Sequence, residues 1–186
     1  PAVATPSPVS LTELPAQQPI EGLLDQAALD TVVSAAIERW AAVGASENQL
    51  AAMRAVHFTL ADLGGLYLGK SEGDTVTIDD DAAGFTWFVD ATLAEDGEYR
   101  DDGGRLIAVS GTSADGRVDL LTVILHELGH RIGLTDDYTP AADDVMAGTI
   151  QPGERRLPGT ADLDAAGDAP VTGTAYALSP VSLGTL

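Results

Sequence analysis

The amino-acid sequence predicts an α+β fold, in which helices and short strands build a single domain. A long helical pattern of apolar residues occupies positions 21–43. Several short runs between positions 56 and 110 have the composition and alternation of strands. A second apolar helical stretch spans about 118–132. Together these elements predict one domain with helices and sheet around a common core.

The composition fits one folded domain flanked by two tails. The chain has 186 residues and 45% of them are hydrophobic, which suffices for a core. Five prolines within residues 1–20 oppose helix and sheet, so this segment is predicted to be an arm or linker. The folded domain is expected over residues 21–166. The small and polar residues 167–186 are predicted to form a flexible tail.

The charge balance excludes some classes of partner. The chain has nine Lys and Arg residues against 29 Asp and Glu residues, a net charge of −20. The negative electrostatic potential of such a chain repels nucleic acid and anionic lipid, and it attracts divalent cations and cationic substrates. A high negative charge also suits solubility in a salty medium. No run of about 18 apolar residues is present, so no membrane insertion is expected. The absence of cysteine excludes disulfides, cysteine-based zinc fingers and cysteine proteases.

Capping and stop signals bound the first two helices. Gly44 suits the residue that ends the first helix. Residues 46–49 have the sequence Ser-Glu-Asn-Gln, a capping box that predicts a short second helix reaching about Arg54. The apolar stripe of the first helix is predicted to lie in the core. Its members at helical spacing are Leu24, Ala28, Val32, Ala36 and Trp40.

The strand predictions depend on short apolar runs. Residues 56–61 alternate, which predicts a half-buried strand with His57 on the face opposite Val56 and Phe58. The Gly- and Asp-rich segment 94–105 is predicted to be a surface loop, and residues 161–166 a last helical turn. Further strands are predicted at 75–78, 85–89 and 106–110.

Three adjacent carboxylates follow the strand at 75–78. Asp79, Asp80 and Asp81 repel one another unless solvent or a cation screens them. Ca²⁺ is a hard cation that prefers oxygen ligands, so this run is a candidate calcium site, although it lacks the spacing of an EF-hand loop. A solvated acidic turn is the alternative.

The segment 126–136, with the sequence His-Glu-Leu-Gly-His-Arg-Ile-Gly-Leu-Thr-Asp, carries the strongest chemical signal. His126 and His130 lie one turn apart on the same face of a helix, so both imidazoles can reach one metal ion. Glu127 points to a neighbouring face, where it can hold a water on the metal instead of the metal itself. This arrangement occurs in zinc hydrolases.

The residues after the second histidine extend the motif. Gly133 can take the positive φ that ends the helix and turns the chain back. Asp136 then offers a carboxylate as the third metal ligand. Asp137 and Glu154 are the alternatives for that position. Two imidazoles and a carboxylate suit zinc best, although iron or cobalt could also be loaded.

With Met146 ten residues further on, the whole pattern resembles that of the metzincin metalloproteases. Their motif is His-Glu-x-x-His-x-x-Gly-x-x-His/Asp, followed by a methionine turn. Aspartate at position 136 is similar to the snapalysin type. Upstream, residues 36–40 resemble the first helix of matrixins, and 73–81 with Trp87 resembles their acidic strand and loop. The resemblance covers about residues 21–160 and extends to matrixin-type domains in long bacterial secreted or surface proteins.

The resemblance implies a metzincin-like fold, with a small twisted mixed β-sheet packed on a long N-terminal helix and an active-site helix, a methionine turn and a short C-terminal part. It also implies a zinc endopeptidase that is secreted or on the bacterial cell surface. Its substrates would be proteins or peptides, and it would act as a monomer or as part of a larger multidomain chain.

The resemblance also assigns roles to individual residues. Glu127 would be the general base for a zinc-bound water. Met146 would form an apolar floor under the metal. Apart from the resemblance, Tyr138 lies close enough to Asp136 in the sequence to be a candidate oxyanion donor or substrate contact, and the alternative is a tyrosine that is simply packed. His57 is either an exposed strand histidine or, as in some matrixins, a ligand of a second metal.

Two other functions fit the same residues. A self-processing protease would cut its own flanks, because the proline-rich start and the small-residue end are accessible substrates. A zinc-bound structural or adhesive module of a large surface protein would have no need of a base. The presence of Glu127 therefore favours the enzyme.

Overall fold

The computed structural model describes residues 23–103, 105–138 and 144–166. The predicted arm at 1–20 and the predicted tail at 167–186 lie outside the described residues. The elements follow in the order α1 (Gln26–Ala42), α2 (Glu47–Arg54), β1 (His57–Ala61), β2 (Gly69–Glu72), β3 (Thr75–Asp79), β4 (Trp87–Phe88), β5 (Tyr99–Asp101), β6 (Leu106–Ala108), β7 (Val118–Asp119), α3 (Leu120–Arg131), β8 (Glu154–Arg155) and α4 (Thr160–Ala165).

Local signals fix the ends of the first two helices. α1 begins after Asp25, whose side chain accepts a hydrogen bond from an amide of the first turn, so it starts later than position 21. Gly44 follows its end with a φ of 106°. The predicted capping box is confirmed, because Ser46 and Gln49 each bond the other's backbone amide at the start of α2.

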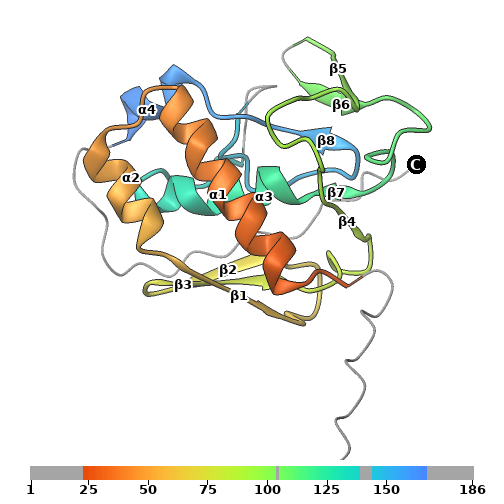
Figure 1. Ribbon diagram of the computed structural model, residues 1–186, viewed down its shortest axis with the longest axis horizontal. Coiled ribbons are helices and arrows are strands. Elements are labelled where there is room, and N and C mark those ends of the chain that lie inside the picture. Colours follow the sequence, from red (N-terminus) through yellow and green to blue (C-terminus); the bar gives the residue numbers. More distant parts are fainter. Residues whose placement is uncertain (1–22, 104, 139–143, 167–186) are drawn as a thin grey trace, which may run out of the picture.

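A small mixed sheet lies below the two long helices in Figure 1. Its strand order is β1-β3-β2, with β1 parallel to β3 and β2 antiparallel to it. The sequence prediction missed β2, because Gly-Lys-Ser-Glu contains no apolar residue. This strand lies at the edge of the sheet and contacts α3, so it runs beside the helix that carries the two histidines.

The remaining strands form two further small sheets. β4 pairs with β7 in parallel, and β5, β6 and β8 form an antiparallel sheet. The prediction of a surface loop over 94–105 is therefore wrong at β5, which forms a strand by pairing with β6. The strand predicted at 85–89 shortens to β4, because Thr86 has a φ of 62° and cannot continue a strand. The second long helix starts at Leu120, since the two residues before it are β7.

The core lies where α1 crosses α3 (Figure 1). Every residue of α3 is buried, so this helix is the centre of the domain. Trp40 of α1 is fully buried and donates its indole N–H to the carbonyl of Leu125, at 3.2 Å. This bond ties α1 to the turn before His126 and Glu127. No helix among the described residues is long and apolar enough to span a membrane.

Candidate metal centre

Helix α3 brings the two histidines together. The helix is capped by Asp119, whose carboxylate accepts the amide of Thr122 at 3.1 Å. One turn apart near the other end, His126 and His130 are both buried, with ring centroids 4.7 Å apart. The two imidazoles therefore lie side by side on one face of the helix, as the motif predicts.

Asp136 reaches the same point from the loop after the helix. Gly133 has the positive φ that the sequence predicts, 94°, and turns the chain back. Oδ1 of Asp136 then lies 3.0 Å from Nε2 of His126 and 3.4 Å from Nε2 of His130. One ligand atom from each of the three side chains falls within 4.8 Å of the others.

Backbone carbonyls orient both imidazoles. Nδ1 of His126 lies 3.0 Å from the carbonyl oxygen of Val145, and Nδ1 of His130 lies 3.0 Å from that of Leu134. A carbonyl can only accept, so each Nδ1 donates, and each Nε2 of a neutral ring presents its lone pair. Two lone pairs and a carboxylate oxygen then converge in a buried space. This donor set fits a divalent cation, and zinc in particular.

The electrostatics of the three side chains match that role. Burial lowers the pKa of His126, which keeps its ring neutral. Burial alone would raise the pKa of Asp136, but the imidazole of His126 and then that of His130 outweigh it and hold this pKa well below its usual range. For His130, burial lowers the pKa, whereas Asp136 and Glu127 raise it and prevail. Metal binding at this group would therefore displace a proton.

Glu127 has an unusual environment. The side chain is 0% exposed, and neither carboxylate oxygen has a hydrogen-bond partner among the described residues. Burial, the largest effect, raises its pKa to about 7, with Asp136 adding to the rise and His130 opposing it. A Cβ added to Gly69 in β2 would lie 2.6 Å from Oε1 of Glu127, so the edge strand passes directly against the carboxylate. No sequence pattern indicates this contact, because β2 and α3 are far apart along the chain.

Met146 packs under the same helix. Its side chain is buried, and a Cβ added to Gly129 would lie 2.5 Å from the methionine sulfur. The glycine between Glu127 and His130 thus allows Met146 to touch the helix backbone. Asp144 supports the turn by accepting the amide of Met146 at 2.7 Å.

A short backbone ladder joins the loop of Asp136 to the turn of Met146. Asp137 and Ala147 form a parallel bridge. The amide of Asp137 donates to the carbonyl of Met146 at 2.8 Å, and the amide of Gly148 donates to the carbonyl of Asp137 at 2.9 Å. The third candidate ligand and the methionine are therefore held in one fixed arrangement.

The alternatives for the third ligand lie elsewhere. The carboxylate of Asp137 is not in the described ligand group, although its backbone forms the ladder. Glu154 is buried in β8, where its oxygens accept from Arg156 at 3.0 and 3.1 Å. His57 is exposed on β1 and also lies outside the described ligand groups. The ligand role of Asp136 is the assignment that this geometry favours.

The acidic run after β3 forms a second cluster. Carboxylate oxygens of Asp79, Asp80 and Asp81 lie within 4.8 Å of one another. Partial burial and then the neighbouring carboxylates raise the pKa of Asp80. Asp79 already accepts the amides of Leu63 at 2.9 Å and Ala83 at 2.7 Å, so it also has a structural role. Calcium binding here stays a prediction.

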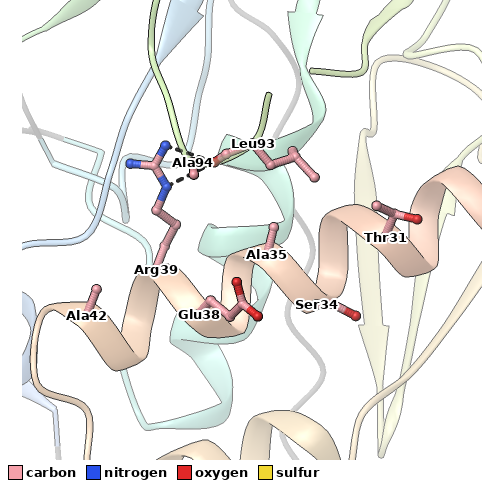
Figure 2. A pocket seen from close by; sticks show the side chains of 8 residues that line it. All are labelled: Thr31, Ser34, Ala35, Glu38, Arg39, Ala42, Leu93 and Ala94. Carbon is pink, nitrogen blue, oxygen red and sulfur yellow. Dashed lines mark hydrogen bonds between the residues drawn. The ribbon is translucent and has the colours of Figure 1, made fainter. Parts of the chain in front are cut away.

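Two cavities differ in their relation to the metal group. One of about 440 Å³ is lined by Asp136, Asp137 and Met146, and so adjoins the candidate ligands. Another of about 560 Å³ lies between α1 and the Leu93–Ala94 segment, where Arg39 donates to the carbonyl of Leu93 (Figure 2). None of the candidate site residues lines this second cavity.

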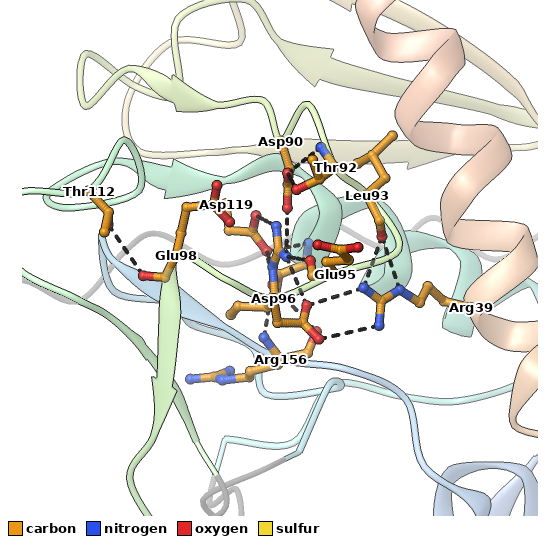
Figure 3. A network of polar contacts seen from close by, with 12 residues as sticks. Arg39, Asp90, Thr92, Leu93, Glu95, Asp96, Glu98, Thr112, Asp119 and Arg156 are labelled. Carbon is orange, nitrogen blue, oxygen red and sulfur yellow. Dashed lines mark hydrogen bonds and ion pairs between the residues drawn. The ribbon is translucent and has the colours of Figure 1, made fainter.

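A separate polar cluster surrounds Arg155, which is fully buried. Its guanidinium lies 2.9 Å from carboxylate oxygens of Asp90, Asp96 and Asp119. Figure 3 shows these three carboxylates gathered from different segments around one point. No local pattern indicates this cluster, because Asp119 and Arg155 are far from each other and from Asp90 and Asp96 along the chain.

An α+β fold with two histidines on a buried helix, an aspartate after a glycine turn and a methionine beneath them has the arrangement expected of a metzincin-type metal centre. The matrixin profile matches residues 15–167, and the chain belongs to this family. The predicted resemblance and fold class are thereby confirmed. Matrixins are zinc-dependent endopeptidases, so zinc and peptide substrates follow at the level of the family. No curated protein and no solved structure gives a match to the chain.

Proposed function

We propose that this chain is a zinc endopeptidase in which His126, His130 and Asp136 hold the metal and Glu127 is the general base. The observation that carries the proposal is the convergence of three acceptor atoms beside a carboxylate that is fully buried and has no described hydrogen-bond partner. A structural site would leave no reason to bury an unpaired carboxylate, because such burial costs stability.

The residues divide the reaction between them. When bound, zinc supplies Lewis acidity that polarises the scissile carbonyl and makes a water more acidic. Glu127 accepts a proton from the attacking water and returns it to the nitrogen of the amine as the C–N bond breaks. A cation at the ligand group would lower the pKa of Glu127 from about 7, so that the carboxylate form is present at neutral pH.

Neighbouring residues have supporting roles in this proposal. Asp136 reduces the charge of the site by one compared with three histidines, so the water would be somewhat less acidic than in a three-histidine site. Met146 is the apolar floor that packs against the histidine helix. Tyr138 is 62% exposed beside the loop of Asp136 and is the candidate donor to the oxyanion or contact to the substrate.

The proposal also includes the location of the enzyme and the charge of its substrates. Family members are commonly extracellular, and we place this protein outside the cell or on its surface. The net charge of −20 favours cationic substrates over anionic ones. Cleavage of its own flanks, and a zinc-bound structural or adhesive role, are the competing functions.

The decisive experiment measures metal content by mass spectrometry and casein cleavage on the same samples. Wild type is expected to hold one zinc and to lose cleavage with a chelator. Asp136→Ala is expected to lose both properties, whereas Asp137→Ala, its matched control, retains them. Glu127→Gln is expected to keep zinc and to lose activity by about 10²–10⁴-fold, the usual contribution of a general base.

The other outcomes discriminate the alternatives. Zinc retained in Asp136→Ala but lost in Asp137→Ala would move the ligand to the neighbour. Zinc in an inactive wild type would favour the structural module. A longer chain that shortens with time, unless Glu127 is replaced by Gln, would identify self-processing.

A further inference from the structure

We propose that Gly148 is a positioning residue that holds the ring of Tyr138 beside the metal-ligand loop. The inference depends on the proposed function, because it assigns a purpose to the place of Tyr138. It concerns a glycine that lies outside the metal-binding motif and that no sequence pattern singles out.

Backbone conformation does not explain the glycine at position 148. Ten described glycines have a positive φ that disfavours other residues, among them Gly133, but Gly148 is not one of them. Alanine could therefore adopt the same backbone. The reason for glycine must lie in the space around its α-carbon.

That space is occupied by the ring of Tyr138. A Cβ on Gly148 would lie 2.7 Å from Cε1 of the ring and 3.1 Å from both Cδ1 and Cζ. Ordinary carbon–carbon contacts are about 3.5–4.0 Å, so the ring would have to move. Gly148 is buried even though Tyr138 is 62% exposed, because the ring covers the glycine and faces solvent on its other side.

The backbone ladder fixes the two residues against each other. Asp137 bridges Ala147 in parallel, so the next pair in register is Tyr138 and Gly148. An aromatic ring lying over a glycine on the neighbouring strand is a known stabilising pair in sheets. The same ladder joins the loop of Asp136 to the turn of Met146. A displaced ring would therefore disturb the segment that follows Asp136 without removing any of the three candidate metal ligands.

A double-mutant cycle tests this coupling. Gly148→Ala is expected to lower kcat by about 10-fold or more, up to the roughly 10²–10³-fold that loss of a whole oxyanion donor costs, with KM and zinc content unchanged. In a Tyr138→Phe background, which lacks the hydroxyl, Gly148→Ala should change kcat by less than about twofold. Gly97→Ala is the matched control, because its Cβ would meet nothing within 4 Å and its φ is ordinary.

Two kinetic results would overturn the proposal. One is a Gly148→Ala enzyme with the kcat of wild type. The other is an equal loss in the wild-type and Tyr138→Phe backgrounds, which would show that the glycine acts independently of the tyrosine.

A spectroscopic measurement separates this inference from the proposed function. In the NMR spectrum of the wild-type chain, the α-protons of Gly148 should be shifted by the ring above them and return to ordinary positions in Tyr138→Leu. Their signals are assigned by their loss in Gly148→Ala. Unshifted α-protons would refute the inference. Shifted α-protons in a chain that cleaves no protein would confirm the contact between Tyr138 and Gly148 and would refute only the proposed endopeptidase function.

Discussion

Carboxylates are buried at both ends of helix α3, but the two ends differ in the hydrogen-bond donors that surround these carboxylates. At the start of the helix, Asp119 accepts from the hydroxyl of Thr122 at 2.6 Å and from the guanidinium of Arg155 at 2.9 and 3.1 Å. Near the other end, the carboxylate of Glu127 has no described hydrogen-bond partner. Among the described residues, the carboxylate of Asp136 has two imidazole nitrogens as partners.

This difference distinguishes a structural cluster from a chemical one. A buried charge surrounded by donors is compensated within the protein and fixes the packing of its neighbours. A buried carboxylate without donors is compensated only when something binds beside it. Burial and acidity alone would not separate the two clusters, whereas the inventory of donors does.

Removal of Arg155 should have the largest effect on stability. Arg155→Met leaves Asp90, Asp96 and Asp119 around an uncharged side chain, and we expect the free energy of unfolding to fall by about 3–5 kcal/mol. Urea unfolding at neutral pH measures it. Arg100→Met, which breaks an exposed pair with Asp102, should cost less than about 1 kcal/mol. Equal losses in the two variants would contradict the structural role of the cluster.

The buried carboxylate of Glu127 should make the free energy of unfolding depend on pH. Because the folded-state pKa of Glu127 is raised from 4.5 to about 7, its contribution to stability is present below pH 4.5 and is lost as pH rises through 7. Metal-free wild type should therefore lose about 3 kcal/mol relative to metal-free Glu127→Gln between pH 4.5 and pH 8. Urea unfolding in chelator at several pH values measures the difference. Parallel curves for the two proteins would mean that Glu127 is solvated or paired.

The packing of Met146 should give the smallest of the three effects. Gly129→Ala gains up to about 1 kcal/mol in helix propensity but forces the methionine sulfur away from the helix, an overpacking that costs about 1–3 kcal/mol. We expect a small net loss in thermal stability together with weaker zinc binding, because the displaced turn also supplies the carbonyl of Val145 to His126. A more stable variant with unchanged zinc affinity would show that the contact is dispensable.

Much of the candidate site could be predicted from short sequence patterns. His126 and His130 lie on one helix face because any helix places residues four apart together. Gly133 takes the predicted positive φ, and the capping box at Ser46 forms as expected. These features depend on residues within a few positions of one another, so local rules suffice.

Other features had no local signal. The edge strand β2 has a polar sequence, and it forms a strand because it pairs with β3. Likewise, β5 lies in a segment whose Gly and Asp content indicated a loop. Strand formation there depends on partners far along the chain, which a short window does not contain.

The sequence by itself determined the metal-binding motif, the two long helices and the acidic character of this protein. Only the tertiary structure decided that Glu127 is buried without a hydrogen-bond partner in the part of the chain that it describes, that Gly69 lies against it, and that the ring of Tyr138 lies on Gly148. The physical reason is that ligand spacing on a helix is set by a fixed local geometry. Burial, hydrogen-bond satisfaction and close contact are properties of segments that meet only when the chain has folded.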